Sequence, residues 1–261
     1  MSLEKKVNDA MKTMVVSDLH GQFVDNKAYK IMLQYARDYK PDNFVINGDL
    51  LDFYTVSTFD KNPERKENIQ YELQAGENIV KNIRKNIGSK AKLYFLEGNH
   101  DARLQRFVWR NPELEGLEAL ELPNLLNLDK YNCKFIGVDN DYWKTDNGHL
   151  KIGDMLIMHG DNRLNGASTS KYSGYSAKNT MMGLQNSVLI GHVHRLAQVY
   201  HSTPYGELVG MEGGHLAQPT GTANWQQGFV TFETHRGKTV NPQLHHINKG
   251  KMYDNGKLYK G

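Results

Sequence analysis

Short runs of apolar, mostly β-branched or aromatic residues recur along the chain and predict β-strands. Gly, Asp, Asn or Ser bounds each run, as is usual where strands end. The runs are Met14–Val16, Phe44–Ile46, Leu93–Leu96, Phe135–Val138, Met155–Met158, Val188–Ile190, Gln198–His201, Leu208–Met211 and Gly228–Phe232. From about residue 185 onward, strands are the dominant element predicted.

Two longer segments in the first half, 26–39 and 68–87, carry apolar residues at helical spacing instead. The apolar stripe of the first segment consists of Ala28, Ile31, Met32, Tyr35 and Ala36. Gly88 follows the second segment at the position where a helix commonly ends. Because strands and helices alternate early and strands dominate later, the chain is predicted to be an α/β protein with two packed sheets and helices outside them.

Composition adds that the protein is ordered and globular, since 39% of its 261 residues are hydrophobic and 23% are charged. The net charge of +3 is compatible with anionic substrates but too small to indicate nucleic-acid binding by itself. The single cysteine, Cys133, excludes an intramolecular disulfide and fits a reducing compartment. We found neither a signal-peptide pattern nor an apolar stretch of about 18 residues. The expected location is therefore the cytoplasm, with no membrane partner.

One domain is expected to cover residues 1–248. Its least regular part is 102–150, where Pro112 and Pro123 interrupt the pattern, and we predict that this part forms a rim over the functional site. Residues 249–261 are rich in Gly and Lys and are expected to form a peripheral tail.

The candidate chemistry lies in five short motifs that occur in a fixed order. They are Ser-Asp-Leu-His-Gly at 17–21, Gly-Asp-Leu-Leu-Asp at 48–52, Gly-Asn-His-Asp at 98–101, Met-His-Gly-Asp at 158–161 and Gly-His-Val-His at 191–194. Each motif directly follows a predicted strand. Ligands in α/β sheets bind outside the carboxyl ends of the strands, so we expect the five motifs to converge at one edge.

The side chains of these motifs form a mixed oxygen and nitrogen donor set that is large enough for two divalent cations. Such donors suit Mn²⁺, Fe, Zn²⁺ or Ni²⁺ better than a metal that prefers thiolates, and Mn²⁺ is our first choice. Two adjacent cations are typical of enzymes that hydrolyse or transfer groups at phosphorus. The motifs therefore favour an enzyme acting on phosphoesters.

In its motifs and their order, the chain resembles the calcineurin-like metallophosphoesterases, over residues 14 to about 215. The resemblance implies a four-layer α-β-β-α sandwich of two mixed sheets with flanking helices, and a dimetal centre at one edge. By position, it assigns Asp18, His20 and His194 to one metal ion. It assigns Asn99, His159 and His192 to the other, with Asp49 bridging both.

The same resemblance gives roles to three further residues. A hydroxide that bridges the two metal ions is expected to attack phosphorus in line. His100 is expected to stand beside the metals and protonate the leaving oxygen, with Asp101 orienting it. Asp52, which closes the second motif, is predicted to order its loop by hydrogen bonding.

Contacts to substrate are predicted from neighbouring residues. Arg103 and Arg163 are candidates for binding phosphate, because arginine binds phosphate in a bidentate manner. Phe53 and Tyr54 are candidates for walls of the substrate pocket, with core packing as the equal alternative. Arg106 and Arg110 share a helical face with Arg103 and are interpreted as a solvated surface. His215 is the best candidate for a supporting role behind the metal ligands.

Several functions remain open at this point. The first choice is a phosphomonoesterase or phosphodiesterase acting on a small molecule or nucleotide, and the main alternative is a nuclease. A phosphoprotein phosphatase is disfavoured, because that branch has an Arg-Gly pair after the second motif and Glu in the third, where this chain has Asp52-Phe53-Tyr54 and Asp101. An inactive scaffold is disfavoured because the ligand set is intact. The oligomeric state is not predicted.

Overall fold

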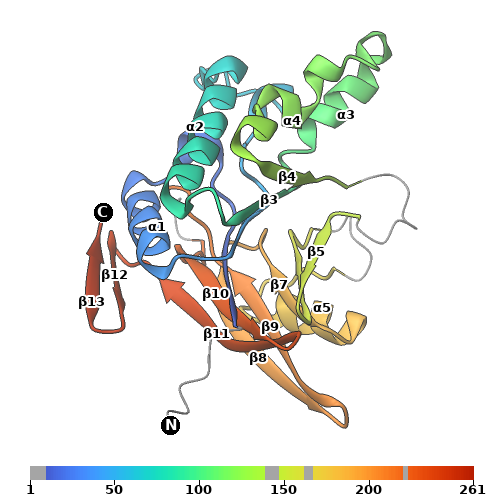
Figure 1. The fold of residues 1–261 in the computed structure, drawn as a ribbon. Helices are drawn as coiled ribbons and strands as arrows, with labels where there is room; N and C mark the ends of the chain where they lie inside the picture. The colour runs from blue at the N-terminus through green and yellow to red at the C-terminus, as the bar shows by residue number, and fades with distance from the viewer. Residues whose placement is uncertain (1–9, 139–146, 162–166, 220–222) are drawn as a thin grey trace.

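Two mixed β-sheets face each other, and helices cover their outer faces (Figure 1). This arrangement is seen in a computed structural model, which describes residues 10–138, 147–161, 167–219 and 223–261. The first sheet has the strand order β11-β10-β1-β2-β3-β4, and the second has the order β5-β6-β7-β9-β8. The predicted four-layer α-β-β-α sandwich is confirmed.

The first sheet is parallel from β1 to β4 and becomes antiparallel at β10 and β11. Its strands are β1 (Met11–Val16), β2 (Asn43–Asn47), β3 (Lys92–Leu96), β4 (Cys133–Ile136), β10 (Gly228–His235) and β11 (Lys238–His246). In the second sheet, β6, β7 and β9 are parallel and the two outer strands are antiparallel to their neighbours. Its strands are β5 (His149–Ile152), β6 (Met155–Met158), β7 (Ser187–Ile190), β8 (Leu196–Thr203) and β9 (Gly206–Gly213).

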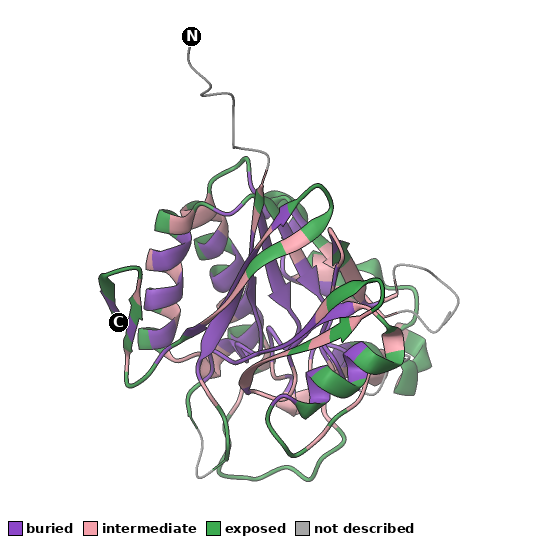
Figure 2. Ribbon diagram, turned by 90° about the horizontal axis from the view of Figure 1, so that it is seen from below, coloured by how far each residue is buried: buried purple, intermediate pink, exposed green. Residues whose placement is uncertain are grey.

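The central strands are buried on both faces because their alternating residues enter two different cores. Met14 and Val16 of β1 pack toward the helices, and Val15 between them packs toward the second sheet. Phe44 and Val45 of β2 divide in the same way. In Figure 2 the central strands and the inner faces of the helices are accordingly purple, and the green, exposed residues lie on the outer strands, helix faces and loops.

Helices α1 (Asn26–Tyr39) and α2 (Ile69–Ile87) cover the first sheet, and α5 (Tyr175–Leu184) covers the second. The predicted stripe of α1 is the face that it buries. Asp25 caps this helix by accepting a hydrogen bond from the Ala28 amide at 2.8 Å. No helix within the described ranges has the length and apolar character needed to cross a membrane.

The rim segment contains α3 (Arg103–Arg110), α4 (Leu122–Leu125) and a series of short turns. The turns are the 3-10 helices η3 (Pro112–Leu114), η4 (Glu118–Leu120) and η5 (Leu128–Tyr131); two others, η1 (Gly21–Phe23) and η2 (Tyr54–Val56), follow β1 and β2. Residues 139–146 of the predicted rim lie outside the described residues.

The end of the chain is less peripheral than we expected. Strands β12 (Lys251–Asp254) and β13 (Lys257–Lys260) form a hairpin. Met252 and Tyr259 of this hairpin are buried in the core beneath α1, where the ring of Tyr259 lies 5.6 Å from that of Tyr35. The Gly and Lys residues of this segment therefore occupy the turn and the exposed face of a packed hairpin.

Candidate metal centre

The first two motifs lie side by side beyond the carboxyl ends of β1 and β2. The amide of Asp18 donates to the carbonyl oxygen of Gly48 at 3.1 Å. The amides of Leu19 and His20 donate to the carbonyl oxygen of Asp49 at 3.0 and 2.9 Å. These bonds extend the pairing of the two parallel strands, so the carboxylates of Asp18 and Asp49 are held close together.

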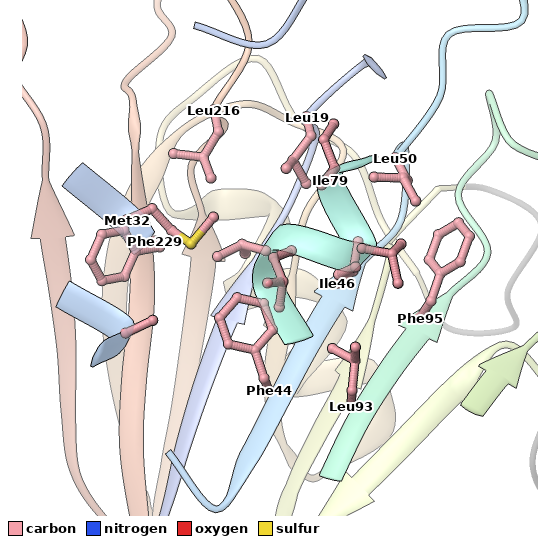
Figure 3. Packing of buried hydrophobic residues seen from close by; sticks show 14 of the residues in the cluster. Leu19, Met32, Phe44, Ile46, Leu50, Ile79, Leu93, Phe95, Leu216 and Phe229 are labelled. Atoms are coloured by element: carbon pink, nitrogen blue, oxygen red, sulfur yellow. The ribbon is translucent and has the colours of Figure 1, made fainter. Parts of the chain in front are cut away.

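Leucines between the polar residues anchor both loops in the core. Leu19 and Leu50 are fully buried among Ile46, Ile79 and their neighbours (Figure 3). Fully burying one leucine side chain stabilises the folded state by about 1.5–3 kcal/mol. The buried leucines therefore hold the loops in place, while the Asp and His side chains of the loops face the site.

The second sheet brings its motifs to the same place. The amide of Gly191 donates to the carbonyl oxygen of His159 at 2.9 Å, and the amide of His192 donates to Asp18 Oδ2 at 3.0 Å. The side-chain amide of Asn47 donates to the carbonyl oxygen of Met158 at 2.9 Å, which ties the two sheets together. The predicted convergence of the five strand ends is therefore present in the structure.

Five predicted metal ligands have a left-handed backbone conformation that is uncommon outside glycine. They are Asp18, His20, Asp49, His192 and His194, with φ between 50° and 62°. Strained backbone positions of this kind gather at functional sites, where the surrounding structure maintains them. Other non-glycine residues of the chain also have positive φ, but these five strained positions all belong to the predicted ligand set.

Three groups of side chains at this edge have the geometry to hold a metal ion, and within each group the possible ligand atoms lie within 4.8 Å of one another. One consists of Asp18, His20 and His194, and another of Asp49, His159 and His192. The third, His20, Asp52 and His100, shares His20 with the first. The side-chain oxygen of Asn99 joins the second group at 3.1 Å from Nε2 of His159. The first two groups match the two ligand sets that the resemblance implied.

The donor atoms of the first group point at one another in a way that suits a cation. Nε2 of His20 and Nε2 of His194 lie 3.3 Å apart. Asp18 Oδ1 is buried without a hydrogen bond of good geometry, although Nε2 of His194 lies 3.1 Å away. A buried carboxylate oxygen normally has a hydrogen-bond donor or a metal ion as its partner, so these residues fit a divalent cation.

The second group fits a cation through the orientation of His159. Nδ1 of its ring lies 3.0 Å from the carbonyl oxygen of Asn47, which can only accept, so Nδ1 donates. Nε2 is thereby directed toward Asp49 Oδ2 at 3.3 Å and toward Asn99. A ring fixed in this way by its other nitrogen is characteristic of metal-binding histidines.

Charges within the site keep its carboxylates ionised. Burial alone would raise the pKa of Asp49, but the histidines around it, His159 foremost, hold that pKa well below its ordinary range. Conversely, burial acts to lower the pKa of His159, but the Asp49 carboxylate outweighs burial and raises it to about 10. Because metals bind the deprotonated ring, a cation at Nε2 of His159 would release a proton on binding.

Two glycines allow the motifs to come this close. Gly48 has φ = 82°, and a Cβ there would collide with the ring of His159. A Cβ on Gly98 would collide with the carboxylate and backbone of Asp49. Close approach of backbone to functional side chains thus requires glycine at both positions.

His100 lies beside the metal-ligand candidates, but its orienting partner differs from the predicted one. Its Nδ1 lies 2.7 Å from Asp52 Oδ1, so Asp52 holds the ring. Asp101 instead accepts hydrogen bonds from the amides of Leu51 and Gly98 at 2.9 and 2.8 Å. The prediction that Asp101 orients His100 is therefore wrong: its buried carboxylate joins the second and third motifs.

Asp101 and Asp52 also differ in their ionisation. Burial, together with the nearby Asp49 carboxylate, raises the pKa of Asp101 to about 7. Burial acts in the same direction on Asp52, but hydrogen bonds from His100 and His20 outweigh it and lower the pKa of Asp52. Asp52 is therefore the ionised partner of the histidine.

The four residues predicted to contact substrate lie in different surroundings. Arg103 lies at the site, with Nη2 3.2 Å from Nε2 of His100 and Nη1 2.6 Å from the carbonyl oxygen of Asp52. Phe53 is fully buried in the core, so its prediction as a pocket wall is wrong and the packing alternative holds. Tyr54 is partly buried beside Arg65, whose guanidinium carbon lies 3.7 Å from the centre of its ring. Arg163 lies outside the described residues.

Three further residues support the ligands, and two of them, Glu72 and Trp225, carried no recognised signal in the sequence. Glu72 of α2 is fully buried and accepts hydrogen bonds from the amides of Asp52 and Phe53, both at 2.6 Å. The ring of His215 stacks on that of His194 at 5.1 Å, which agrees with the supporting role predicted for it. Trp225 packs its edge against His194 at 4.4 Å.

The rim segment contains a cavity that is separate from the metal-ligand groups. Its volume is about 580 Å³, and it lies between α3, the following turns and β4. Of the predicted site residues, only Asp101 lines it. We therefore assign the candidate chemistry to the metal-ligand groups and not to this cavity.

The chain belongs to the calcineurin-like phosphoesterase family. Residues 11–217 match the sequence profile described as calcineurin-like phosphoesterase. The matched segment contains all five motifs, and the family predicted from them is confirmed. Members of the family typically bind two divalent metal ions, which agrees with the two ligand groups described above.

Relatives of similar length are found in mycobacteriophages. The gene 54 protein of Mycobacterium phage L5 is 29% identical over 268 residues, covering 95% of this chain and 98% of that protein. The gene 54 protein of Mycobacterium phage D29 is also 29% identical over the same length and with the same coverage.

Among solved structures, the similarity to this chain is weaker. A metallophosphoesterase from Sphaerobacter thermophilus has a TM-score of 0.47 at 14% identity, covering 92% of this chain and 89% of its own. Vacuolar protein sorting 29 from Cryptosporidium parvum has a TM-score of 0.45 at 12% identity, covering 97% and 96%. Membership of the family rests on the sequence match and not on these structures.

Proposed function

We propose that the protein is a hydrolase of phosphoester bonds that depends on two divalent metal ions. Asp18, His20 and His194 would hold one ion, and Asn99, His159 and His192 would hold the other. Asp49 would contact both. The observation that carries this proposal is the meeting of the two ligand groups at one edge. There Asp49 Oδ2 lies 3.3 Å from Nε2 of His159, and Asp49 Oδ1 accepts a hydrogen bond from the His100 amide.

When bound, two such cations supply hydroxide at neutral pH for in-line attack and offset the negative charge that develops on the phosphoryl oxygens. The protein's own contribution is to place a proton donor beside them. Nε2 of His100 lies 3.9 Å from Asp49 Oδ2, and the side chain is partly exposed. Nδ1 is held by Asp52, and Nε2 accepts from the Arg103 guanidinium in this structure. Nε2 would deliver a proton to a leaving oxygen once the ring is protonated and Arg103 contacts the substrate instead.

The proposed substrate is a small phosphomonoester or phosphodiester, and the proposed metal is Mn²⁺. Oxygen and imidazole donors of the kind gathered here support Mn²⁺, with Fe, Zn²⁺ and Ni²⁺ as the other choices. The partly buried Arg103 beside His100 supports an anionic substrate. We also propose that the enzyme works in the cytoplasm, where its single thiol stays reduced.

Metal content and hydrolysis together test this proposal. We expect about two equivalents of metal per chain after loading with Mn²⁺, and hydrolysis of an aryl phosphomonoester or phosphodiester. His159→Gln should lose about one equivalent and reduce turnover by about a thousandfold or more, since the metal ions supply most of the charge stabilisation. The exposed His246→Gln is the control and should behave like the unaltered protein.

Two outcomes would contradict the proposal. Protein that binds no divalent metal would remove its basis, and metal-loaded protein inactive on every phosphoester would favour a scaffold. A substrate panel separates the remaining choices: aryl monoester, aryl diester, 2′,3′-cyclic nucleotides, and single- and double-stranded DNA. Activity confined to DNA would replace the small-molecule assignment with a nuclease.

A further inference from the structure

A small basic pocket adjoins the metal-ligand groups. Its volume is about 130 Å³, and it lies between α3 and residues 56–59, which include the end of η2. Arg103, Arg106 and Arg110 line one side, and Asn99 lies at its inner end. The volume equals about four water molecules, which suits one phosphate-sized group.

The three arginines converge because of their spacing on α3. Positions three and seven residues apart lie on one face of a helix. The sequence alone led us to interpret Arg106 and Arg110 as a solvated surface, but both face this pocket. The opposite wall consists of Val56 and the three residues after it, and no carboxylate lines the pocket in the described part of the chain.

The arginines differ in how their charges are satisfied. Arg103 Nη1 lies 3.7 Å from Asp52 Oδ1, and Arg110 donates to the carbonyl oxygen of Val56 at 3.0 Å. Arg106 is partly buried, yet its guanidinium has no hydrogen bond or ion pair to any residue that the structure describes. An anion would give this partly buried guanidinium the charge-assisted hydrogen bonds that it lacks.

Asn99 connects this pocket to the proposed reaction centre. Its side chain lines the pocket, and its Oδ1 lies 3.1 Å from Nε2 of His159. An anion held by Arg106 is therefore about one side chain away from the metal-ligand groups. Because one side chain contacts both places, a single molecule could present one phosphate group to each.

We propose that this pocket binds a second phosphate group of the substrate, next to the phosphoester that is hydrolysed. This inference rests on the proposed function and narrows it to substrates that carry at least two phosphates. Arg106 supplies the main contact, and Arg110 widens the positive surface at the mouth. The second phosphate belongs either to a small bisphosphorylated molecule or to the neighbouring link of a nucleic-acid strand.

Binding tests the pocket independently of hydrolysis. Calorimetry would compare thymidine 3′,5′-bisphosphate with the 3′- and 5′-monophosphates on the metal-loaded protein. We expect the bisphosphate to bind about tenfold more tightly than either monophosphate, as is reasonable for an added charge-assisted contact. Arg106→Ala should abolish this advantage and Arg106→Lys should keep part of it. Arg37→Ala, an exposed arginine on α1, should leave the advantage intact.

Kinetics with a matched substrate pair completes the test. The p-nitrophenyl ester of thymidine 5′-phosphate would be compared with the same ester carrying a 3′-phosphate, so the scissile bond is unchanged. The expected result is a lower KM for the phosphorylated ester, and this advantage should disappear in Arg106→Ala. A still lower KM with a short oligothymidylate would identify a nucleic-acid strand as the source of the second phosphate. An unchanged KM would identify a small bisphosphorylated molecule.

The two proposals fail in different ways. In one outcome, both esters are hydrolysed while neither the bisphosphate nor the 3′-phosphorylated ester binds more tightly than its counterpart with one phosphate. That result overturns the pocket assignment and leaves the phosphoesterase proposal in place. An equal loss on both esters in Arg106→Ala would also overturn the pocket assignment. If neither ester is hydrolysed, the binding comparison still decides whether the pocket holds a phosphate.

Discussion

Asp52 Oδ1 lies 2.7 Å from Nδ1 of His100, across 48 residues of sequence. The same oxygen lies 3.5 Å from Nδ1 of His20, which belongs to a metal-ligand group. Asp52 therefore connects the proposed proton donor to the proposed metal centre. Its pKa is lowered although burial opposes this, because His100 and His20 both donate to it.

Removing the Asp52 carboxylate should therefore impair turnover more than metal binding. For Asp52→Ala we expect kcat to fall about 10–100-fold, the effect that is usual for residues that orient a functional histidine. Metal content, measured by mass spectrometry, should stay near that of the unaltered protein.

The matched variant is Asp52→Asn, which keeps an acceptor for Nδ1 of His100 but loses the charge. It should retain more activity than Asp52→Ala, because the ring stays oriented. Equal activity of Asp52→Ala and the unaltered protein would show that His100 needs no partner. Loss of metal in both variants would show that Asp52 supports the metal centre and not only His100.

Gly48 offers a test of the packing between the two sheets. Gly48 and Gly88 have similar φ values, 82° and 79°, but a Cβ on Gly88 would meet no atom within 4 Å, whereas one on Gly48 would collide with the His159 ring. Both Gly→Ala variants should lose on the order of 1–3 kcal/mol through backbone strain. Only Gly48→Ala should also lose metal and activity.

Chemical denaturation and metal analysis of the two variants separate these effects. Gly88→Ala should remain active at a temperature where it is folded. Its loss in the free energy of unfolding then measures the cost of backbone strain alone. Gly48→Ala that binds two metal equivalents with unaltered activity would show that the ring of His159 can move aside.

The sequence identified the central strands and the ligands at their ends because both are local patterns. Strands buried on both faces give continuous apolar runs, and each motif follows its strand directly. Two edge strands lack that signal: β11 and β5 carry mostly exposed or partly exposed residues and were not predicted, whereas the edge strands β4 and β8 were. Helix α5 was missed because its sequence is mainly small and polar.

Pairings between distant segments could not be read from the sequence. Asp52 and Asp101 are both carboxylates near His100, and only the fold shows that Asp52 reaches the ring while Asp101 joins backbone amides. Phe53 could have lined a pocket until the structure placed it in the core. Arg106 looked like a surface residue because the opposing wall at 56–59 belongs to another part of the chain.

Glu72 is predicted to stabilise the loop that carries Asp52. Its Oε1 accepts both loop amides, and burial raises its pKa despite these hydrogen bonds. Glu72→Ala would leave two buried donors unsatisfied and should lower the free energy of unfolding by about 2 kcal/mol. Activity should fall as well, because Asp52 loses its fixed position.

Glu72→Gln is the matched variant, since an amide oxygen accepts the same two bonds without charge. We expect it to be close to the unaltered protein in urea denaturation and in kcat. The exposed Gln74→Ala on the same helix should change neither quantity. A strong defect in Glu72→Gln would mean that the negative charge of Glu72, and not its hydrogen bonds, is what the loop requires.

His245 should make the protein sensitive to mild acid at a place far from the metal-ligand groups. Its ring is buried between Tyr35 and Phe229, with Nε2 2.7 Å from the Thr231 hydroxyl oxygen. Burial lowers the pKa of His245 to about 4, although Asp254, at 3.4 Å from Nδ1, opposes this. The unfolded chain, with an ordinary value near 6.5, therefore binds the proton first.

The sign of the effect follows from this order. The contribution of neutral His245 to stability is complete above about pH 6.5 and is lost progressively as the pH falls toward 4. Between pH 7 and pH 5 the loss should be about 2 kcal/mol. Urea denaturation of His245→Gln should show a smaller loss over this interval, by about that amount, whatever constant offset the substitution adds. His246→Gln, at the exposed neighbouring position, should follow the unaltered protein. A pH dependence that is the same with and without His245 would show that this buried ring does not govern acid sensitivity.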